Sequence, residues 1–400
     1  MMKTHTLRWG VLGAGGIARR RTIPEGILAA PHATLVAVYD ADPRVCAAVA
    51  SEFGAAAATS EQDLMGADID AVYVATPAHL HAAHVRMAAK VGKHVLCEKP
   101  LGLCVEESRS MAADCEAGGV ILGTALMMRF HSQHRAALDL IRDGSLGEPV
   151  LGRAQLSCWY PPIPGAWRQD PTLAGGGSLM DMGGHCLDLL EMFFGPVSEV
   201  SCFTANRIHA YASEDAALAS LRFANGALGS VDAFFCIPDV SSRNVLELYG
   251  SRGSILASGT IGQAAGGSMT FFPGDIADYS ADQKRTASGG IAITPPEINT
   301  YQAEIEEFCL AILEKRQPEN SAEIGSAASY CWIPATPPPA AGARRKFLHF
   351  NPTHHDHRNP TGNQNAGIQG RHAALHRIPT RQTWPHRPGR AGGWLRLWVS

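Results

Sequence analysis

A short apolar segment, residues 7–12, runs directly into a glycine-rich turn in which Gly13, Gly15 and Ala18 follow the pattern G-x-G-x-x-A. A helix-compatible stretch comes next. Gly13 permits the tight turn, Gly15 lets the backbone approach a phosphate group, and Ala18 allows close packing of the helix against the strand. The helix N-terminus attracts the phosphate charge. The residues expected at this phosphate site are Gly13, Gly15, Gly16, Ile17 and Ala18. The pattern predicts a dinucleotide-binding turn.

Asp40 closes the next apolar segment, residues 35–39, and stands 22 residues beyond Ala18. A carboxylate at this point accepts hydrogen bonds from the adenosine ribose and repels a 2′-phosphate. We therefore predict NAD as the cofactor in preference to NADP, although Arg44 could still tolerate a phosphate. The alternative interpretation of Asp40 is a helix N-cap or a turn residue.

Strand and helix patterns alternate through the first 125 residues. Short continuous apolar segments separated by amphipathic stretches are typical of a parallel sheet covered on both faces. The expected strands are residues 7–12, 35–39, 71–75, 94–97 and 120–122. The expected helices are residues 42–53, 78–91 and 105–117. We predict an α/β N-terminal domain, residues 1–128, with a doubly wound Rossmann sheet.

The pattern changes after about residue 129, where strand-like segments and hairpin turns at 224–226 and 250–253 predominate. The expected strands are residues 152–158, 200–204, 216–223, 227–235 and 244–250. The expected helices are residues 177–194 and 299–315. These segments predict a second domain, residues 129–326, of the α+β class with a large, mostly antiparallel sheet.

Three further motifs occur in addition to the glycine-rich turn. Residues 75–81 read ATPAHLH and residues 89–100 read AKVGKHVLCEKP. In the second domain, Trp167 and Arg168 precede residues 175–188, which read GGGSLMDMGGHCLD. In this order the motifs resemble those of the glucose–fructose oxidoreductase / inositol dehydrogenase / MocA (Gfo/Idh/MocA) family, over roughly residues 7–326.

The resemblance implies an NAD(P)-dependent oxidoreductase that acts on a CH–OH group of a cyclic polyol or sugar, with Lys99, Asp181 and His185 as its catalytic set. Alcohol oxidation in any case needs a hydride acceptor, a base for the hydroxyl proton and donors that stabilise the alkoxide. Asp181 and His185 are four residues apart, so a helix places them on one face. His185 titrates near neutral pH and is the natural base. The Asp181 carboxylate could orient the imidazole, stabilise its protonated form or bind a substrate hydroxyl.

Lys99 follows directly after an expected strand, at the sheet edge where ligands of open α/β sheets bind. The resemblance implies that Lys99 also contacts the nicotinamide ribose and that Glu98 lies beside the nicotinamide pocket. Asp188 is expected to support His185 from the same helix face. No third ligand is suitably spaced from Asp181 and His185, so we expect no metal. Besides the turn and Asp40, the expected cofactor-binding residues are Thr76, Pro77, His81, Glu98, Lys99 and Arg168.

His185 stands where relatives resembling dihydrodiol and xylose dehydrogenases carry tyrosine, so it favours an inositol- or hexose-dehydrogenase type. Two other functions are compatible with the fold. One is an NAD-assisted glycosidase, which oxidises, eliminates and reduces in one cycle but typically carries an export signal. The other is a non-catalytic dinucleotide-binding regulator, against which the presence of Lys99, Asp181 and His185 argues.

Charge is divided unequally along the chain. Residues 343–400 carry ten Lys and Arg against one acid, Asp356, so this segment is +9 and the remainder of a chain of net charge −3 is −12. An acidic body does not attract nucleic acid or anionic membrane. Residues 327–400, rich in Pro, His and Arg and without periodicity, are predicted to be disordered or translated in an altered reading frame. The rival hypothesis is a basic arm that binds nucleic acid.

The ten cysteines lack metal-ligand spacing, and the N-terminus lacks the pattern of a signal peptide. We therefore expect reduced thiols, a cytoplasmic location and no membrane span. The resemblance implies a homo-oligomer, a dimer or tetramer, formed through the open face of the second domain's sheet.

Overall fold

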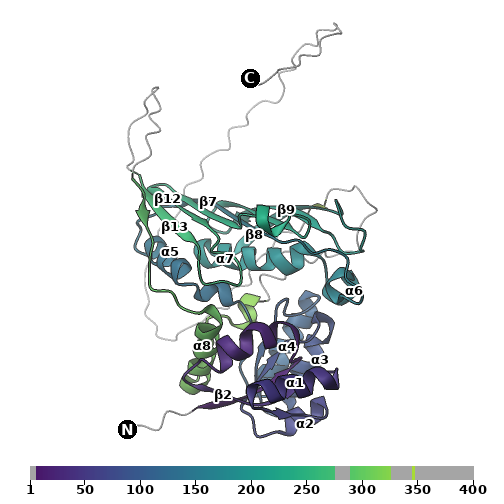
Figure 1. The fold of residues 1–400 in the computed structure, drawn as a ribbon. Helices are drawn as coiled ribbons and strands as arrows, with labels where there is room; N and C mark the ends of the chain where they lie inside the picture. The colour runs from purple at the N-terminus through teal and green to yellow at the C-terminus, as the bar shows by residue number, and fades with distance from the viewer. Residues whose placement is uncertain (1–5, 275–288, 326–344, 347–400) are drawn as a thin grey trace, which may run out of the picture. The chain divides into compact units, whose positions relative to one another are not determined.

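The computed structural model describes residues 6–274 and 289–325, and the backbone of residues 345–346. Apart from those two residues, the predicted tail at 327–400 lies outside the described residues. Figure 1 shows the described chain as two layered parts, one around each sheet.

The first sheet has six strands in the order β3-β2-β1-β4-β5-β6, and every neighbouring pair is parallel. Its strands are β1 (Leu7–Leu12), β2 (Ala33–Tyr39), β3 (Ala56–Ala57), β4 (Ala71–Val74), β5 (His94–Cys97) and β6 (Leu122–Thr124). Crossover helices cover both faces, because parallel neighbours cannot be joined by tight hairpins. The predicted doubly wound Rossmann sheet is confirmed.

Two clusters of buried apolar side chains lie on opposite faces of this sheet. One cluster joins the sheet to η1 (Ala18–Ile27), α1 (Pro43–Phe53) and α8 (Thr300–Glu314). The other joins it to α2 (Glu61–Gly66), α3 (His81–Lys90) and α4 (Val105–Ala117). Packing on both faces explains why the strands read as continuous apolar runs rather than alternating ones.

Helix η1, which follows the glycine turn, is wound as a π-helix. Pro24 lies inside it and has no N–H to donate to the carbonyl four residues earlier. At the end of the helix the Leu28 N–H donates instead to the carbonyl of Ile23, five residues back, at 3.0 Å. The wider winding therefore lets the chain continue in helical form past the proline.

Helix α8 comes from the second half of the sequence but packs against the first sheet. Asn299 caps it by accepting the N–H groups of Tyr301 and Gln302. Its buried face includes Phe308, whose ring centroid lies 5.7 Å from that of Trp9 in β1. Figure 1 shows α8 beside the purple N-terminal elements. The chain thus returns to the first core after completing the second sheet.

The second sheet has nine strands in the order β14-β13-β12-β11-β7-β10-β9-β8-β15. Its strands are β7 (Pro149–Ser157), β8 (Val197–Ala205), β9 (Ala216–Phe223), β10 (Leu228–Phe234), β11 (Val245–Gly250), β12 (Gly253–Ser258), β13 (Ser268–Pro273), β14 (Ile291–Ala292) and β15 (Arg345–Lys346). Among the described strands of this second sheet, only β7 and β10 pair in parallel. The predicted large, mostly antiparallel sheet is confirmed.

One face of the second sheet packs on α5 (Ser132–Arg142) and α7 (Gly184–Phe194), as Figure 1 shows. Along β9 buried and exposed residues alternate, so the opposite face is left open. Within the described part of the chain, no helix combines the length and apolarity that crossing a membrane requires.

Candidate active site

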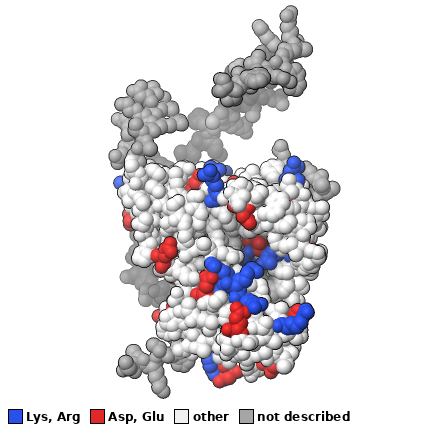
Figure 2. Space-filling view, in the orientation of Figure 1, with Lys and Arg blue, Asp and Glu red and all other residues white. Residues whose placement is uncertain are grey.

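A cavity of about 590 Å³ lies at the carboxyl edge of the first sheet and is closed from the other side by the second sheet and its helices. Figure 2, in the orientation of Figure 1, shows Lys and Arg side chains gathered beside acidic ones near the middle of the face in view. Seven of the predicted site residues line the cavity: Gly16, Ile17, Glu98, Lys99, Arg168, Asp181 and His185. The structure therefore brings together motifs that are up to 169 residues apart in the sequence.

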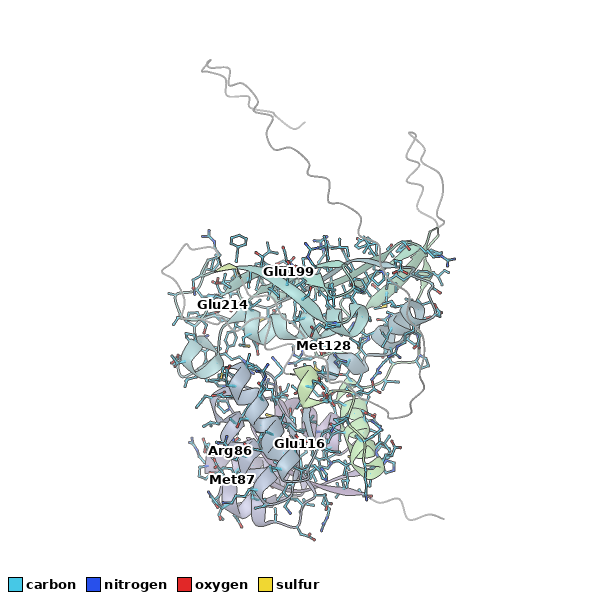
Figure 3. The ribbon with its side chains drawn as sticks, turned by 180° about the vertical axis from the view of Figure 1, so that it is seen from behind. Arg86, Met87, Glu116, Met128, Glu199 and Glu214 are labelled. Atoms are coloured by element: carbon cyan, nitrogen blue, oxygen red, sulfur yellow. The ribbon has the colours of Figure 1, made fainter. Side chains whose placement is uncertain are left out.

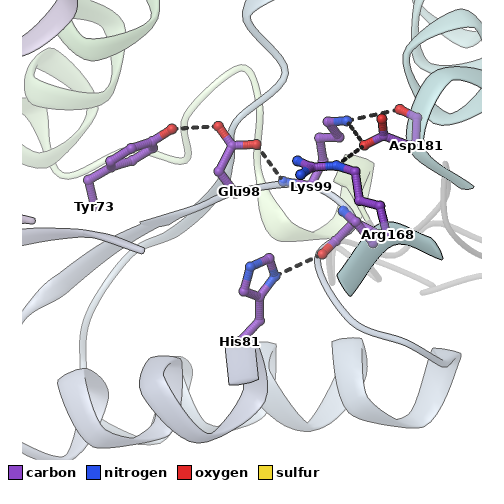
Figure 4. Close-up of polar contacts among 7 residues, drawn as sticks. Tyr73, His81, Glu98, Lys99, Arg168 and Asp181 are labelled. Carbon is purple, nitrogen blue, oxygen red and sulfur yellow. Dashed lines mark hydrogen bonds and ion pairs between the residues drawn. The ribbon is translucent and has the colours of Figure 1, made fainter. Parts of the chain in front are cut away.

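Lys99 lies just beyond β5, and its peptide bond to Pro100 is cis. Its ammonium Nζ donates to Asp181 twice, to carboxylate Oδ1 at 2.7 Å and to the main-chain oxygen at 2.9 Å (Figure 4). His81, buried below, has Nδ1 2.9 Å from the carbonyl oxygen of Pro100 and Nε2 2.9 Å from that of Thr76. The backbone around Lys99 is thus held from beneath while its ammonium reaches into the cavity.

Asp181 sits in η5 (Leu179–Gly183), a π-helical turn that leads into α7. Its Oδ1 also accepts Arg168 Nε at 3.2 Å. Burial disfavours the Asp181 carboxylate, but the charges of Lys99 and Arg168 outweigh it and lower the pKa of Asp181 below its usual value. Glu214, between β8 and β9 (Figure 3), steadies this turn by accepting the Leu179 N–H at 3.0 Å.

His185, in the first turn of α7, is 7% exposed. Orienting this imidazole was one of the three roles considered for Asp181, but Lys99 and Arg168 occupy that carboxylate instead. Nδ1 of His185 is buried and has no hydrogen-bond partner among the described residues. Burial, assisted by the Lys99 charge, lowers the pKa of His185 to about 3, which corrects the expectation of a near-neutral value. The imidazole is therefore neutral over the ordinary pH range, and its Nδ1 is left without a partner among the described residues.

Asp188 does not support His185, contrary to expectation. Its carboxylate Oδ1 accepts Arg129 Nε at 2.7 Å, and both side chains are largely buried. The three-residue spacing of His185 and Asp188 permitted the expected contact, whereas Arg129 is 59 residues away in the sequence, so spacing could not reveal this pair.

Glu98 lies between β5 and Lys99. Its Oε1 accepts the Tyr73 hydroxyl at 2.5 Å, and its Oε2 accepts the Lys99 N–H at 3.2 Å (Figure 4). The Thr22 hydroxyl in turn donates to Tyr73 at 3.0 Å. Burial raises the pKa of Glu98. Glu98 is therefore held in place by a short chain of hydroxyl groups that leads away from the cavity.

The glycine turn has the shape that a phosphate site needs. Gly13 has φ +87°, and a Cβ built there would lie 2.8 Å from the backbone of Ala75. Asp40 Oδ2 accepts the Gly15 N–H at 2.9 Å, and its Oδ1 accepts the Asp42 N–H at 3.0 Å. Asp40 thus plays the turn-residue role that was the alternative to ribose binding. The narrow turn and the following helix N-terminus fit a dinucleotide, which would supply the hydride acceptor or donor.

The remaining predicted cofactor contacts lie outside the lining of this cavity. Thr76 Oγ1 is 2.9 Å from His84 Nδ1, and Pro77 precedes η2 (Ala78–Leu80). With Gly13, Gly15, Ala18, Asp40 and His81, these residues shape the sheet edge and remain predictions as cofactor contacts.

Several lining residues carry no recognisable motif. They are Arg20, Tyr160, Asp239, Asn244, Tyr301 and Glu304. Tyr301 and Glu304 are three residues apart, which marks one face of α8. That spacing could have identified a helix face, but not the sheet against which the face packs.

These features define the enzyme class: a Rossmann sheet, a dinucleotide turn and a lysine–carboxylate–histidine cavity belong to NAD(P)-dependent oxidoreductases that act on CH–OH groups. Residues 7–126 match the model described as "Oxidoreductase family, NAD-binding Rossmann fold", and residues 134–256 match the "GFO/IDH/MocA C-terminal domain". The chain belongs to the Gfo/Idh/MocA family.

Relatives in this family cover most of the chain. The 1,5-anhydro-D-fructose reductase of Ensifer adhaerens is 31% identical over 80% of this chain and 92% of that protein. D-Xylose 1-dehydrogenase (NADP(+)) 2 of Haloferax volcanii is 30% identical over 76% and 89%. A levoglucosan dehydrogenase solved in complex with NADH is 25% identical, with a TM-score of 0.70 over 81% of this chain and 94% of the other.

Proposed function

We propose that the cavity catalyses hydride transfer between a nicotinamide and a secondary alcohol or ketone of a cyclic polyol or sugar. The observation that carries the proposal is the convergence of Lys99, Asp181 and His185 on a cavity also lined by Gly16 and Ile17 of the dinucleotide turn. The sugar class is supported by the names of the relatives, which are an anhydrofructose reductase, a xylose dehydrogenase and a levoglucosan dehydrogenase.

The charges in the cavity suit an oxygen that gains negative character. In the oxidation, the Lys99 ammonium donates to the substrate oxygen and stabilises the developing alkoxide, while Asp181 keeps that ammonium in place. Neutral His185 accepts the hydroxyl proton. An imidazolium beside Lys99 is unfavourable, so the proton passes on to water rather than staying on His185. In the reduction the same groups act in reverse.

The far wall of the cavity offers polar groups to the other hydroxyls of a sugar. Asn244 accepts the Ser157 N–H at 3.0 Å and the Ser242 hydroxyl at 2.7 Å through Oδ1, which fixes its side chain. Asp239 accepts the Trp159 N–H at 3.0 Å and also lines the cavity. Fixed polar groups among apolar walls are typical of small-molecule sites.

The direct test is a screen of inositols, hexoses and pentoses for reduction of NAD⁺ and of NADP⁺. We expect at least one cyclic polyol or sugar to yield reduced cofactor in proportion to substrate consumed. Aglycone release without net reduced cofactor would identify a glycosidase instead, and cofactor binding without turnover on any compound would favour a regulator.

We also propose NAD as the preferred cofactor, and Asp40 gives a specific test. In Asp40→Asn the single amide oxygen accepts one of the two main-chain N–H groups that the carboxylate holds, that of Gly15 or that of Asp42, and the negative charge is lost. We expect the affinity for NADP⁺ relative to NAD⁺ to rise by about tenfold or more, because juxtaposed like charges cost about 1.4 kcal/mol or more. Fluorescence titration measures both affinities.

The matched control is Asp114→Asn, which removes a surface charge that pairs with Arg86, away from the glycine turn. It should leave the ratio of affinities nearly unchanged. Preference of the unaltered protein for NADP⁺ would contradict the role given to Asp40.

We propose further that the chain forms homo-oligomers through the open face of the second sheet. Phe203 and Leu218 are cross-strand partners on β8 and β9, and they are 59% and 48% exposed. Exposed apolar neighbours on a sheet face favour association with a second copy. Leu218→Arg should shift the sedimentation coefficient toward the monomer, whereas Val91→Arg, at an exposed apolar site beyond α3, should not. A monomeric unaltered protein would refute this.

A further inference from the structure

Two carboxyl groups line the cavity, those of the partly buried Glu98 and the buried Glu304, and the chemistry above uses neither. Glu98 comes from the end of β5, and Glu304 comes from α8, 206 residues later. Glu304 is only 1% exposed. Both line the same cavity as Lys99 and Ile17, so each borders the space that the phosphate turn and the proposed reacting groups also border.

Neither carboxyl group has an ion-pair partner among the described residues. Glu304 accepts Asn320 Nδ2 at 3.2 Å and the main-chain N–H of Leu126. Glu98 accepts the Tyr73 hydroxyl and the Lys99 N–H. The cations that act on Glu98 over a distance, those of Lys99 and Arg168, both donate to Asp181 instead.

Two carboxylates that face one cavity repel one another, so one of them holds a proton more strongly. Burial and then the charge of Glu98 raise the pKa of Glu304 well above its ordinary value. Burial raises that of Glu98 also, but Lys99 and Tyr73 oppose the rise. The charged and titratable groups that face this pair are Tyr73, Lys99, Arg168, Asp188 and Tyr301, and Arg21 in turn acts on Tyr301. Glu304 is therefore the member of the pair that carries the proton.

We propose that Glu98 and Glu304, which line one cavity, act as a charge-coupled carboxyl pair that distinguishes the oxidised from the reduced nicotinamide, with Glu304 releasing its proton when the positively charged ring binds. The inference rests on the proposed function, which places the nicotinamide in this cavity. A cation beside the pair favours its doubly ionised form, whereas the neutral dihydronicotinamide does not. Binding of the oxidised cofactor is then linked to proton release.

The sign of the pH dependence follows from this linkage. Below the raised pKa of Glu304 the free protein holds the proton, and the oxidised cofactor must expel it to bind tightly. The dissociation constant of NAD⁺ should therefore fall as pH rises, by up to tenfold per pH unit, while that of NADH stays nearly constant. The pH window lies above the ordinary pKa of a glutamate, because burial moves that of Glu304 upward.

Calorimetric titration with NAD⁺ and NADH, in two buffers of different ionisation enthalpy and over pH 5–9, measures the released protons directly. NADP⁺ and NADPH serve as the second pair of probes. We expect NAD⁺ to release up to one proton more than NADH in the unaltered protein. In Glu304→Gln, whose neutral amide imitates the protonated acid, that difference should vanish and the NAD⁺ affinity should stay at the low-pH value of the unaltered protein.

Two further variants keep the test decisive. Glu314→Gln, an exposed position on the same helix that pairs with Arg316, should behave like the unaltered protein. Glu98→Gln removes the repulsion and should move proton release to lower pH, and it covers the case in which Glu304→Gln fails to fold. Equal proton release with NAD⁺ and NADH overturns the carboxyl-pair proposal alone. Absence of binding by all four cofactors overturns the placement of the nicotinamide, and the proposed function with it.

Discussion

Replacing Lys99 with methionine is expected to lower kcat by about 10²–10³-fold, the usual cost of removing one donor to a developing oxyanion. Methionine keeps much of the length of the side chain but offers no donor to the substrate oxygen. It also leaves Asp181 with Arg168 as its one remaining cationic partner among the described residues. The loss should appear in kcat, with a much smaller change in the affinity for NADH. Steady-state kinetics and fluorescence titration of NADH separate the two effects.

Lys90→Met is the matched control, because Lys90 is exposed at the end of α3, away from the cavity. It should retain the kinetic constants of the unaltered protein. If Lys99→Met kept kcat within a few-fold, the lysine would not be the donor to the reacting oxygen, and the proposed roles in the cavity would have to be reassigned.

Replacing His185 with glutamine is expected to lower kcat for oxidation by about 10²–10⁴-fold, the usual contribution of a positioned general base. The pH profile provides a second, independent readout. The imidazole has to be neutral to accept a proton, and burial together with Lys99 lowers its pKa to about 3. Activity that depends on neutral His185 is therefore lost only as pH falls toward 3. The kcat/KM of the unaltered enzyme should show no acid limb near pH 6.5 that is due to this residue.

His79→Gln alters an exposed histidine before α3 and should leave both kcat and the pH profile unchanged. An acid limb near pH 6.5 that disappears in His185→Gln would show that the imidazole titrates as an ordinary histidine. That result would contradict the buried, neutral state derived from the structure.

The sequence predicted elements well where a strong local pattern decides the structure. Strands β1, β5 and β9 and helix α4 begin and end at the predicted residues, since each is a clear apolar run or an amphipathic stretch with distinct ends. It missed α2, which has only six residues, and the hairpin partners β12 and β13. Strands β12 and β13 form because each pairs with a neighbouring strand, and local composition does not reveal that pairing.

The same limit applies to the cavity. Lys99, Asp181 and His185 were identified because they belong to recognisable motifs, but their partners were not. Helix spacing indicated a possible contact between Asp181 and His185, whereas in the structure the Asp181 carboxylate pairs with Lys99, 82 residues away. Glu304 had no motif at all, because its place in the cavity depends on long-range packing. Spacing within a helix indicates which side chains could be in contact, but tertiary packing determines which contacts form.

The return of α8 to the first core has a consequence for how this fold can be divided. Phe308 fills space beside Trp9, and Tyr301 and Glu304 reach the cavity from the same helix. A fragment cut near residue 128 would lose part of its own interior and one wall of its binding site. The dinucleotide-binding half is therefore not a portable module: a chimera that exchanges the second sheet for another has to keep residues 299–315 with the first.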